Sequence, residues 1–125
     1  MAVCWWMGEL ETAKKKAATT YNAAGDYYDH PANTFWERYG RRTVEWLGLT
    51  AGQRVLDVCC ASGASAIPAA KIVGPGGSVI GIDLAQNLLE LARNKAKQQG
   101  LNNIDFQSGD MTRLSFADAS FDVVV

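Results

Sequence analysis

The chain has 125 residues, a length that suits one small domain, and its 12 basic and 13 acidic side chains give a net charge of −1. This balance provides no excess positive charge for the phosphate backbone of nucleic acids, so no nucleic-acid partner is expected. No apolar stretch is long enough for a helix that spans a membrane.

The cysteines and the lone histidine exclude the common metal and disulfide patterns. Cys59 and Cys60 are adjacent, Cys4 is distant, and His30 is the only histidine. Neither a disulfide framework nor a zinc or other metal site is therefore expected. Reduced thiols fit a cytoplasmic protein. We expect Cys59 and Cys60 to be small residues at a strand end rather than nucleophiles.

A first helix is predicted over residues 9–24, where alanines and Tyr21 recur at helical spacing. The lysines at 14–16 would form its solvated face. Gly25 breaks the pattern. The apolar residues 1–7 lack a basic leader and make a poor signal peptide. A tail, a lid and an extension from an upstream start remain open for them.

A second helix is predicted over residues 35–47. Thr34 and Glu37 form a capping-box pattern at its start, and Gly48 ends it. Its expected inner stripe is Trp36, Tyr39 or Gly40, Thr43, Val44 and Leu47.

Strands and helices then alternate, which predicts a parallel α/β sheet. The expected strands are 54–59, 78–82, 104–107 and 121–125, and the expected helices are 64–73 and 85–99. Pro68 suits only the first turn of a helix, so regular helix should begin near Ser65 and leave the preceding N–H groups free for a ligand. Gly100 is the expected end of the last helix.

The turn at residues 59–63 and the acid Asp83 each follow a predicted strand. An open α/β sheet binds nucleosides at such a place, because turn N–H groups approach the ligand and a carboxylate accepts the ribose hydroxyls. Asp83 could also cap the helix that begins near Ala85, and each role needs only one carboxylate oxygen.

Asp57, Cys59, Ala61 and Gly63 resemble the D-x-G-x-G-x-G motif of class I S-adenosylmethionine-dependent methyltransferases. Cys59 and Ala61 replace two of its glycines, so a positive φ at either would be strained. Three further pieces follow in family order: Asp83-Leu84, Gly109-Asp110-Met111 and residues 116–122. The paired cysteines make the segment 56–60 look most like the quinone-biosynthesis-type small-molecule methyltransferases.

The resemblance implies S-adenosylmethionine as the cofactor and methyl transfer to a small-molecule acceptor. It assigns the methionine part to Asp57, the ribose to Asp83, and the adenine to Asp110 and Met111. Each role has a structural alternative, such as a brace of the turn for Asp57 or an ordinary loop acid for Asp110. The expected cofactor-binding residues are Asp57, Cys59, Ala61, Gly63, Asp83, Leu84, Asp110 and Met111.

The resemblance also implies a Rossmann-like, doubly wound parallel sheet whose full strand order is 3-2-1-4-5-7-6. Only the first four strands are expected here, preceded by two helices. We therefore expect an N-terminal extension at residues 1–20 and a cofactor-binding domain at 21–125 that is truncated after its fourth strand. The reaction requires no catalytic side chain, and none is assigned.

Several alternatives remain open. Tyr21, Tyr27 and Tyr28 would form either a lid over the methyl donor or ordinary packing. His30 would be a general base or an exposed loop residue. A non-catalytic nucleoside-binding module is the main alternative function. A dinucleotide oxidoreductase is disfavoured, because the chain has no G-x-G-x-x-G fingerprint. The acceptor and the oligomeric state are not predicted.

Overall fold

The computed structural model describes residues 2–125, with side chains from residue 6 onward. Helices and strands alternate in its second half, as the sequence predicts. The helices are α1 (Ala2–Ala23), α2 (Gly25–Tyr28), α3 (Phe35–Leu47), α4 (Ala66–Val73) and α5 (Gln86–Gln98). The strands are β1 (Arg54–Val58), β2 (Ser78–Asp83), β3 (Ile104–Ser108) and β4 (Val123–Val124).

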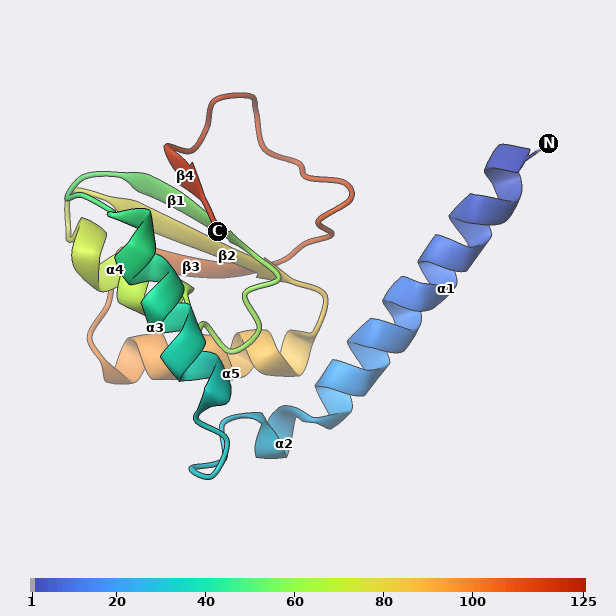
Figure 1. The fold of residues 1–125 in the computed structure, drawn as a ribbon, viewed down its shortest axis with the longest axis horizontal. Helices are drawn as coiled ribbons and strands as arrows, with labels where there is room; N and C mark the ends of the chain where they lie inside the picture. The colour runs from blue at the N-terminus through green and yellow to red at the C-terminus, as the bar shows by residue number, and fades with distance from the viewer. Residues whose placement is uncertain (1) are drawn as a thin grey trace.

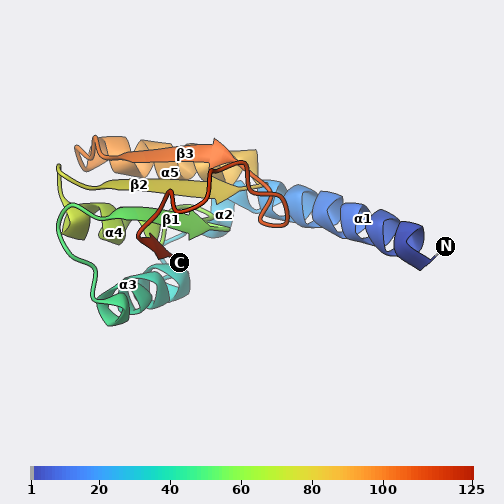
Figure 2. The same ribbon diagram turned by 90° about the horizontal axis from the view of Figure 1, so that it is seen from above.

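The four strands form one parallel sheet in the order β3-β2-β1-β4, which confirms the predicted Rossmann-like fold (Figure 1). β1 pairs with β2 along its whole length, from Arg54 opposite Ser78 to Val58 opposite Ile82. Because all strands run the same way, their carboxyl ends share one edge of the sheet, where ligands bind in such folds (Figure 2).

Helices α4 and α5 pack against the same side of the sheet and enclose the main core (Figure 1). Aliphatic side chains from strands and helices pack together there at 9% exposure or less, with Phe106 among them. Gly48 and Gly100 adopt left-handed φ angles of 60° and 67° after α3 and α5, so both predicted helix ends are confirmed. The largest fully buried aliphatic side chains are those of Val44, Val55, Leu56, Val73, Val79, Leu88 and Leu89.

Helix α3 is predicted correctly in length, and its predicted inner stripe is confirmed only for Gly40 and Val44. Only Gly40 and Val44 are buried, whereas Trp36 and Tyr39 are 43% and 49% exposed. Thr34 makes no side-chain capping bond, so the capping box does not form. α3 instead approaches the turn before α4 through Gly40, where an added Cβ would lie 2.9 Å from the Ala64 Cβ and closer still to the Ala64 carbonyl.

Helix α1 begins seven residues before its predicted start and extends away from the sheet (Figures 1 and 2). Its predicted break is confirmed, but the four-residue helix α2 that follows was not predicted, because Gly25 was interpreted only as a breaker. Asn22 holds the end of α1 to α5: its Oδ1 accepts the Asn87 N–H, and its carbonyl accepts the Asn87 amide, both at 2.9 Å. None of the described helices is both long and apolar enough to cross a membrane.

Candidate functional site

The turn after β1 has an unusual backbone. Cys59 and Ala61 adopt φ angles of 59° and 47°, and Gly63 adopts 84°. A left-handed conformation at a residue with a Cβ costs about 1–2 kcal/mol. The structure therefore contains the strain that the two missing glycines predict, and surrounding contacts must hold the turn in place.

Asp83 supplies one of these contacts from the end of β2. Its Oδ2 accepts the Ala61 N–H at 2.9 Å, and its Oδ1 accepts the Ala85 N–H at 2.8 Å. One carboxylate therefore joins the turn after β1 to the start of α5. Each oxygen keeps a further acceptor position, so these bonds leave Asp83 able to accept hydrogen bonds from a ligand.

Asp57 is the most unusual acid of the chain. It is 4% exposed, and its Oδ2 has no hydrogen-bond partner among the described residues. Burial raises the pKa of Asp57 to about 7, although an Ala66 backbone hydrogen bond opposes the rise, and the charge of Asp83 adds to it. A buried, unpartnered carboxylate oxygen is costly unless a ligand supplies a donor.

A cavity of about 660 Å³ opens at the carboxyl ends of the strands. Seven of the eight predicted cofactor-binding residues line it: Asp57, Cys59, Ala61, Asp83, Leu84, Asp110 and Met111. Gly63 does not. It lines a second cavity behind the turn, and a Cβ there would lie 3.1 Å from Ile67 and 3.2 Å from Phe106. The structure therefore indicates a packing and turn role for Gly63.

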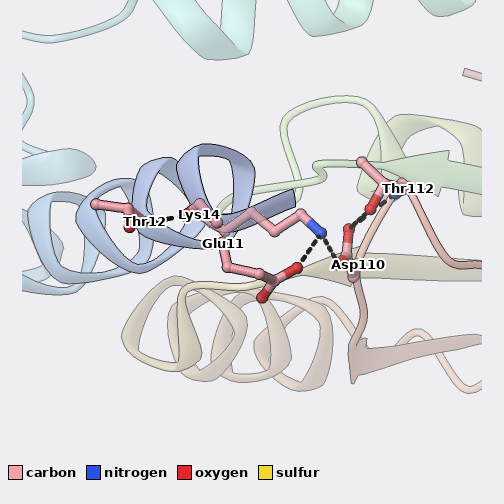
Figure 3. Close-up of polar contacts among 6 residues, drawn as sticks. Glu11, Thr12, Lys14, Asp110 and Thr112 are labelled. Atoms are coloured by element: carbon pink, nitrogen blue, oxygen red, sulfur yellow. Dashed lines mark hydrogen bonds and ion pairs between the residues drawn. The ribbon is translucent and has the colours of Figure 1, made fainter. Parts of the chain in front are cut away.

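Helix α1 closes one side of the cavity, with Leu10, Ala13, Ala17, Ala18 and Tyr21 in its lining. Lys14 joins α1 to the loop after β3, because its Nζ lies 2.7 Å from Asp110 Oδ2 and 2.9 Å from Glu11 Oε1 (Figure 3). The Thr112 N–H and hydroxyl donate to the other oxygen of Asp110 at 2.8 Å.

These partners make Asp110 a stronger acid than an ordinary aspartate. Hydrogen bonds from Lys14 and Thr112 lower the pKa of Asp110 to about 2, so it is ionised at neutral pH. The prediction that Lys14 belongs to a solvated face is wrong, since its side chain is only 14% exposed. Lys15 and Lys16 are exposed, as predicted. Helical spacing alone could not reveal that Asp110 lies opposite Lys14.

Aromatic side chains form a further part of the lining, which we call the aromatic wall. Tyr21, Tyr28, Trp36 and Tyr39 all line the cavity. The rings of Tyr28 and Trp36 stack with centroids 6.1 Å apart and planes 8° apart. Tyr27, by contrast, is 72% exposed and lies outside the lining. The sequence shows Trp36 and Tyr39 as an amphipathic stripe but cannot show that the stripe borders a cavity.

The prediction that the two cysteines are small residues at a strand end describes Cys60 better than Cys59. Cys60 is buried at the strand end, whereas Cys59 is exposed in the cavity lining, with its Sγ 3.4 Å from Met111 Sδ. Burial and nearby carboxylates raise the pKa of both thiols, so neither is a ready nucleophile at neutral pH. His30 accepts the Ala32 N–H and lies outside the cavity lining, so the geometry gives no support to a general base there.

A parallel sheet with a strained turn after β1, acids at the carboxyl ends of β1 and β2 and an acid after β3 defines a nucleoside-binding α/β domain. A family model described as a methyltransferase domain matches residues 49–125. The chain therefore belongs to the class I S-adenosylmethionine-dependent methyltransferases, and its relatives are of the quinone-biosynthesis type.

Two curated relatives and one solved structure illustrate the similarity. Aklanonic acid methyltransferase DauC from Streptomyces sp. (strain C5) is 38% identical over 112 residues, which are 90% of this chain and 51% of that protein. The 2-phytyl-1,4-naphtoquinone methyltransferase of Synechococcus elongatus (strain ATCC 33912 / PCC 7942 / FACHB-805) is 40% identical over 106 residues, which are 84% of this chain and 44% of that protein. The chain thus spans about half the length of these relatives.

The solved structure supports the fold alone. A SAM dependent methyltransferase from Aquifex aeolicus superposes with a TM-score of 0.68 at 23% identity. The match covers 82% of this chain and 54% of that one.

Proposed function

We propose that the cavity binds S-adenosylmethionine and that the chain supports methyl transfer from it to a small, planar aromatic acceptor. One observation carries the proposal: three acids at or just after the carboxyl ends of adjacent parallel strands, Asp57, Asp83 and Asp110, line the same cavity. The cofactor carries an ammonium, two ribose hydroxyls and an adenine amine, which are all hydrogen-bond donors suited to carboxylates.

The residues present fit this group. The unpartnered Oδ2 of Asp57 would accept the ammonium, Asp83 the ribose, and Asp110 the adenine amine beside Met111. When bound, the cofactor supplies a methyl group on a sulfonium centre, which is activated without help from a protein acid or base. The chain's own task is to hold two reactants in line and to exclude water.

The aromatic wall of the cavity supports a planar aromatic acceptor. Tyr28 and Trp36 present parallel aromatic faces, and Tyr39 and Thr43 extend this wall. Flat rings stack favourably on such faces. The named substrates of the two relatives, a naphthoquinone and aklanonic acid, support a ring-bearing acceptor. The acids of the cavity disfavour nucleic acid, because they repel phosphate.

Two further points remain proposals. We propose a cytoplasmic location, which the free thiols of Cys59 and Cys60 support. We also propose that residues 21–125 form the cofactor-binding domain, with 1–20 as an extension that contributes Leu10, Lys14 and neighbouring residues to the cavity wall.

A calorimetric titration tests cofactor binding. S-adenosylmethionine and S-adenosylhomocysteine should compete for one site, whereas NAD should not bind. Asp83→Asn should weaken both sulfur ligands about 30- to 150-fold, which corresponds to the loss of a charge-assisted contact of about 2–3 kcal/mol. Asp118→Asn, in an exposed loop outside the cavity, is the matched control. Unchanged affinity in folded Asp83→Asn protein would contradict the assignment.

A non-catalytic binding module is the second candidate. The observation that favours it is the strained turn, in which Cys59 and Ala61 stand where the family has glycine. An assay of methyl transfer from labelled S-adenosylmethionine to 1,4-dihydroxynaphthalene separates the two. Tight cofactor binding without transfer, also to other planar phenols, would favour the module.

A further inference from the structure

Behind the strained turn, Lys95 of α5 contacts polar groups from three separate segments. Its Nζ lies 3.0 Å from Asp29 Oδ2 and 3.8 Å from Glu37 Oε1, and it donates to Ser62 Oγ at 3.2 Å. The Ser62 hydroxyl in turn donates to Asp29 Oδ1 at 2.7 Å. Ser62 is only 1% exposed, and the side chains of Lys95 and Asp29 are 20% and 26% exposed, so the centre of this network is sheltered from water. Glu37, at 60% exposure, lies at its rim.

Each partner of Lys95 is the direct sequence neighbour of a residue that lines the main cavity. These neighbouring pairs are Tyr28–Asp29, Trp36–Glu37 and Ala61–Ser62. Two of the pairs belong to the aromatic wall and one to the turn after β1. Lys95 itself lines the separate cavity of about 400 Å³ behind the turn. Lys95 therefore contacts residues adjacent to both the turn and the aromatic wall, and it does not itself line the main cavity.

We propose that Lys95 is a positioning residue that fixes the cofactor-binding turn and the aromatic wall relative to each other. The inference rests on the proposed function and adds to it a residue that contacts neither ligand. An ammonium suits this role, because its three N–H donors can serve three acceptors at once. A hydrogen-bond network that is sheltered from water contributes more stabilising free energy than the sum of its separate pairs.

The turn needs such support. Cys59 and Ala61 hold left-handed φ angles that residues with a Cβ adopt only when neighbouring contacts impose them. Asp83 holds the turn at Ala61 from the front, and the Ser62 hydroxyl holds it from behind. Removal of Lys95 leaves Asp29 and Glu37 close together without their shared cation, so the wall and the turn should both shift.

Lys95→Met tests the proposal, since it keeps the length and apolar stem but removes the charge. Affinity for S-adenosylhomocysteine is measured by calorimetry, and affinity for 1,4-naphthoquinone by quenching of tryptophan emission. Both should weaken at least about tenfold in Lys95→Met. Lys97→Met, on an exposed position of the same helix, should stay within about twofold of the wild type. Lys95→Gln, which keeps one donor group, replaces the methionine variant if that fails to fold.

A double-mutant cycle with Ser62→Ala distinguishes positioning from general loss of stability. If Lys95 acts through Ser62, the double variant should bind S-adenosylhomocysteine no more than about twofold worse than the weaker single variant. If the affinity losses of the two single variants multiply in the double variant, the proposal is overturned. Wild-type affinity in folded Lys95→Met, or a loss of affinity for only one of the two ligands, would also overturn it. If the wild type binds neither ligand, the proposed function fails first and the inference falls with it.

Discussion

The sheet with α4 and α5 differs sharply from the N-terminal helices in how its residues are held. In the sheet region Val55 and Leu89 are fully buried, and the contacts are aliphatic. Along the N-terminal helices Trp36 is 43% exposed and Trp6 is 77% exposed. Val44 of α3 reaches the main core, but other contacts of these helices are polar, such as the Lys14–Asp110 pair.

This difference indicates that the sheet region mainly provides stability and the N-terminal helices mainly provide ligand contacts. Aliphatic burial in the sheet region provides most of the folding free energy, because it removes the most apolar surface from water. The N-terminal helices leave aromatic faces open toward the cavity, which suits recognition of a ligand more than stability. Substitutions in the two regions should therefore separate stability from binding.

The largest expected effect is on stability. Leu89→Ala, in the fully buried core, should lower the free energy of unfolding by about 2–5 kcal/mol. Trp36→Ala should lower it by only about 1 kcal/mol, because half-exposed stacking contributes little. Urea denaturation of both variants measures the difference. Equal losses would mean that the aromatic wall is as much a part of the core as the sheet.

A second pair of substitutions targets the turn. Ala61→Leu should weaken S-adenosylhomocysteine binding more than about 100-fold, because Ala61 lines the cavity. Ala61→Gly should keep binding and raise the free energy of unfolding by about 1 kcal/mol, since it relieves a φ of 47°.

Ala119→Gly is the matched control for this pair. Ala119 has a φ of 56° but lies outside the cavity, so the change should stabilise without altering affinity. Wild-type affinity in folded Ala61→Leu would show that the turn does not contact the cofactor.

The third prediction concerns pH and Asp57, whose pKa is raised from 3.8 to about 7. Between these values the folded state holds a proton that the unfolded state releases, so the free energy of unfolding should fall as pH rises from 3.8 to about 7. Cofactor affinity should move the other way. It should rise about tenfold from pH 6 to pH 8, because the ammonium needs the ionised carboxylate.

Asp57→Asn should abolish both trends, which chemical denaturation and calorimetry across this pH range would measure. Asp118→Asn again serves as control. Parallel pH profiles for the wild type and Asp57→Asn would show that Asp57 is not the titrating group.

The smallest expected effect is at the contact between α1 and the rest of the molecule. Lys14→Met should weaken S-adenosylhomocysteine binding about threefold and reduce its dependence on salt, because the Lys14–Asp110 pair holds α1 against the cavity. Lys15→Met, one residue along and exposed, should change neither. Calorimetry at low and high ionic strength measures both quantities. Equal affinity and equal salt dependence in the two variants would show that α1 does not contribute to the binding site.

The sheet was predictable because its signals are local. Apolar runs, the glycines at 48 and 100, and the alternation of strands and helices predict the elements and their parallel arrangement. The strand order β3-β2-β1-β4, by contrast, was expected only from the family resemblance. The sequence predicted that Ala61 would be strained if its φ were positive. Only the structure shows that its φ is positive.

The walls of the cavity were less predictable for a physical reason. An aromatic stripe has the same spacing whether it packs into a core or borders a ligand site, so Trp36 was interpreted as core. Lys14 was interpreted as solvated because its partner Asp110 is distant in sequence. Gly63 matches the motif, but its Cβ position faces Ile67 and Phe106 rather than the cavity.

Gly40 gives the cavity its width. A methyl group at this position would meet the Ala64 carbonyl and Cβ, so α3 could not lie where it does. The aromatic wall on α3 and the cofactor-binding turn consequently stand at a separation set by one absent side chain. Methyl transfer depends steeply on the gap between donor and acceptor atoms, which must close to about 3–3.5 Å. In the proposed reaction, Gly40 would thus set the distance between the aromatic wall and the cofactor-binding turn.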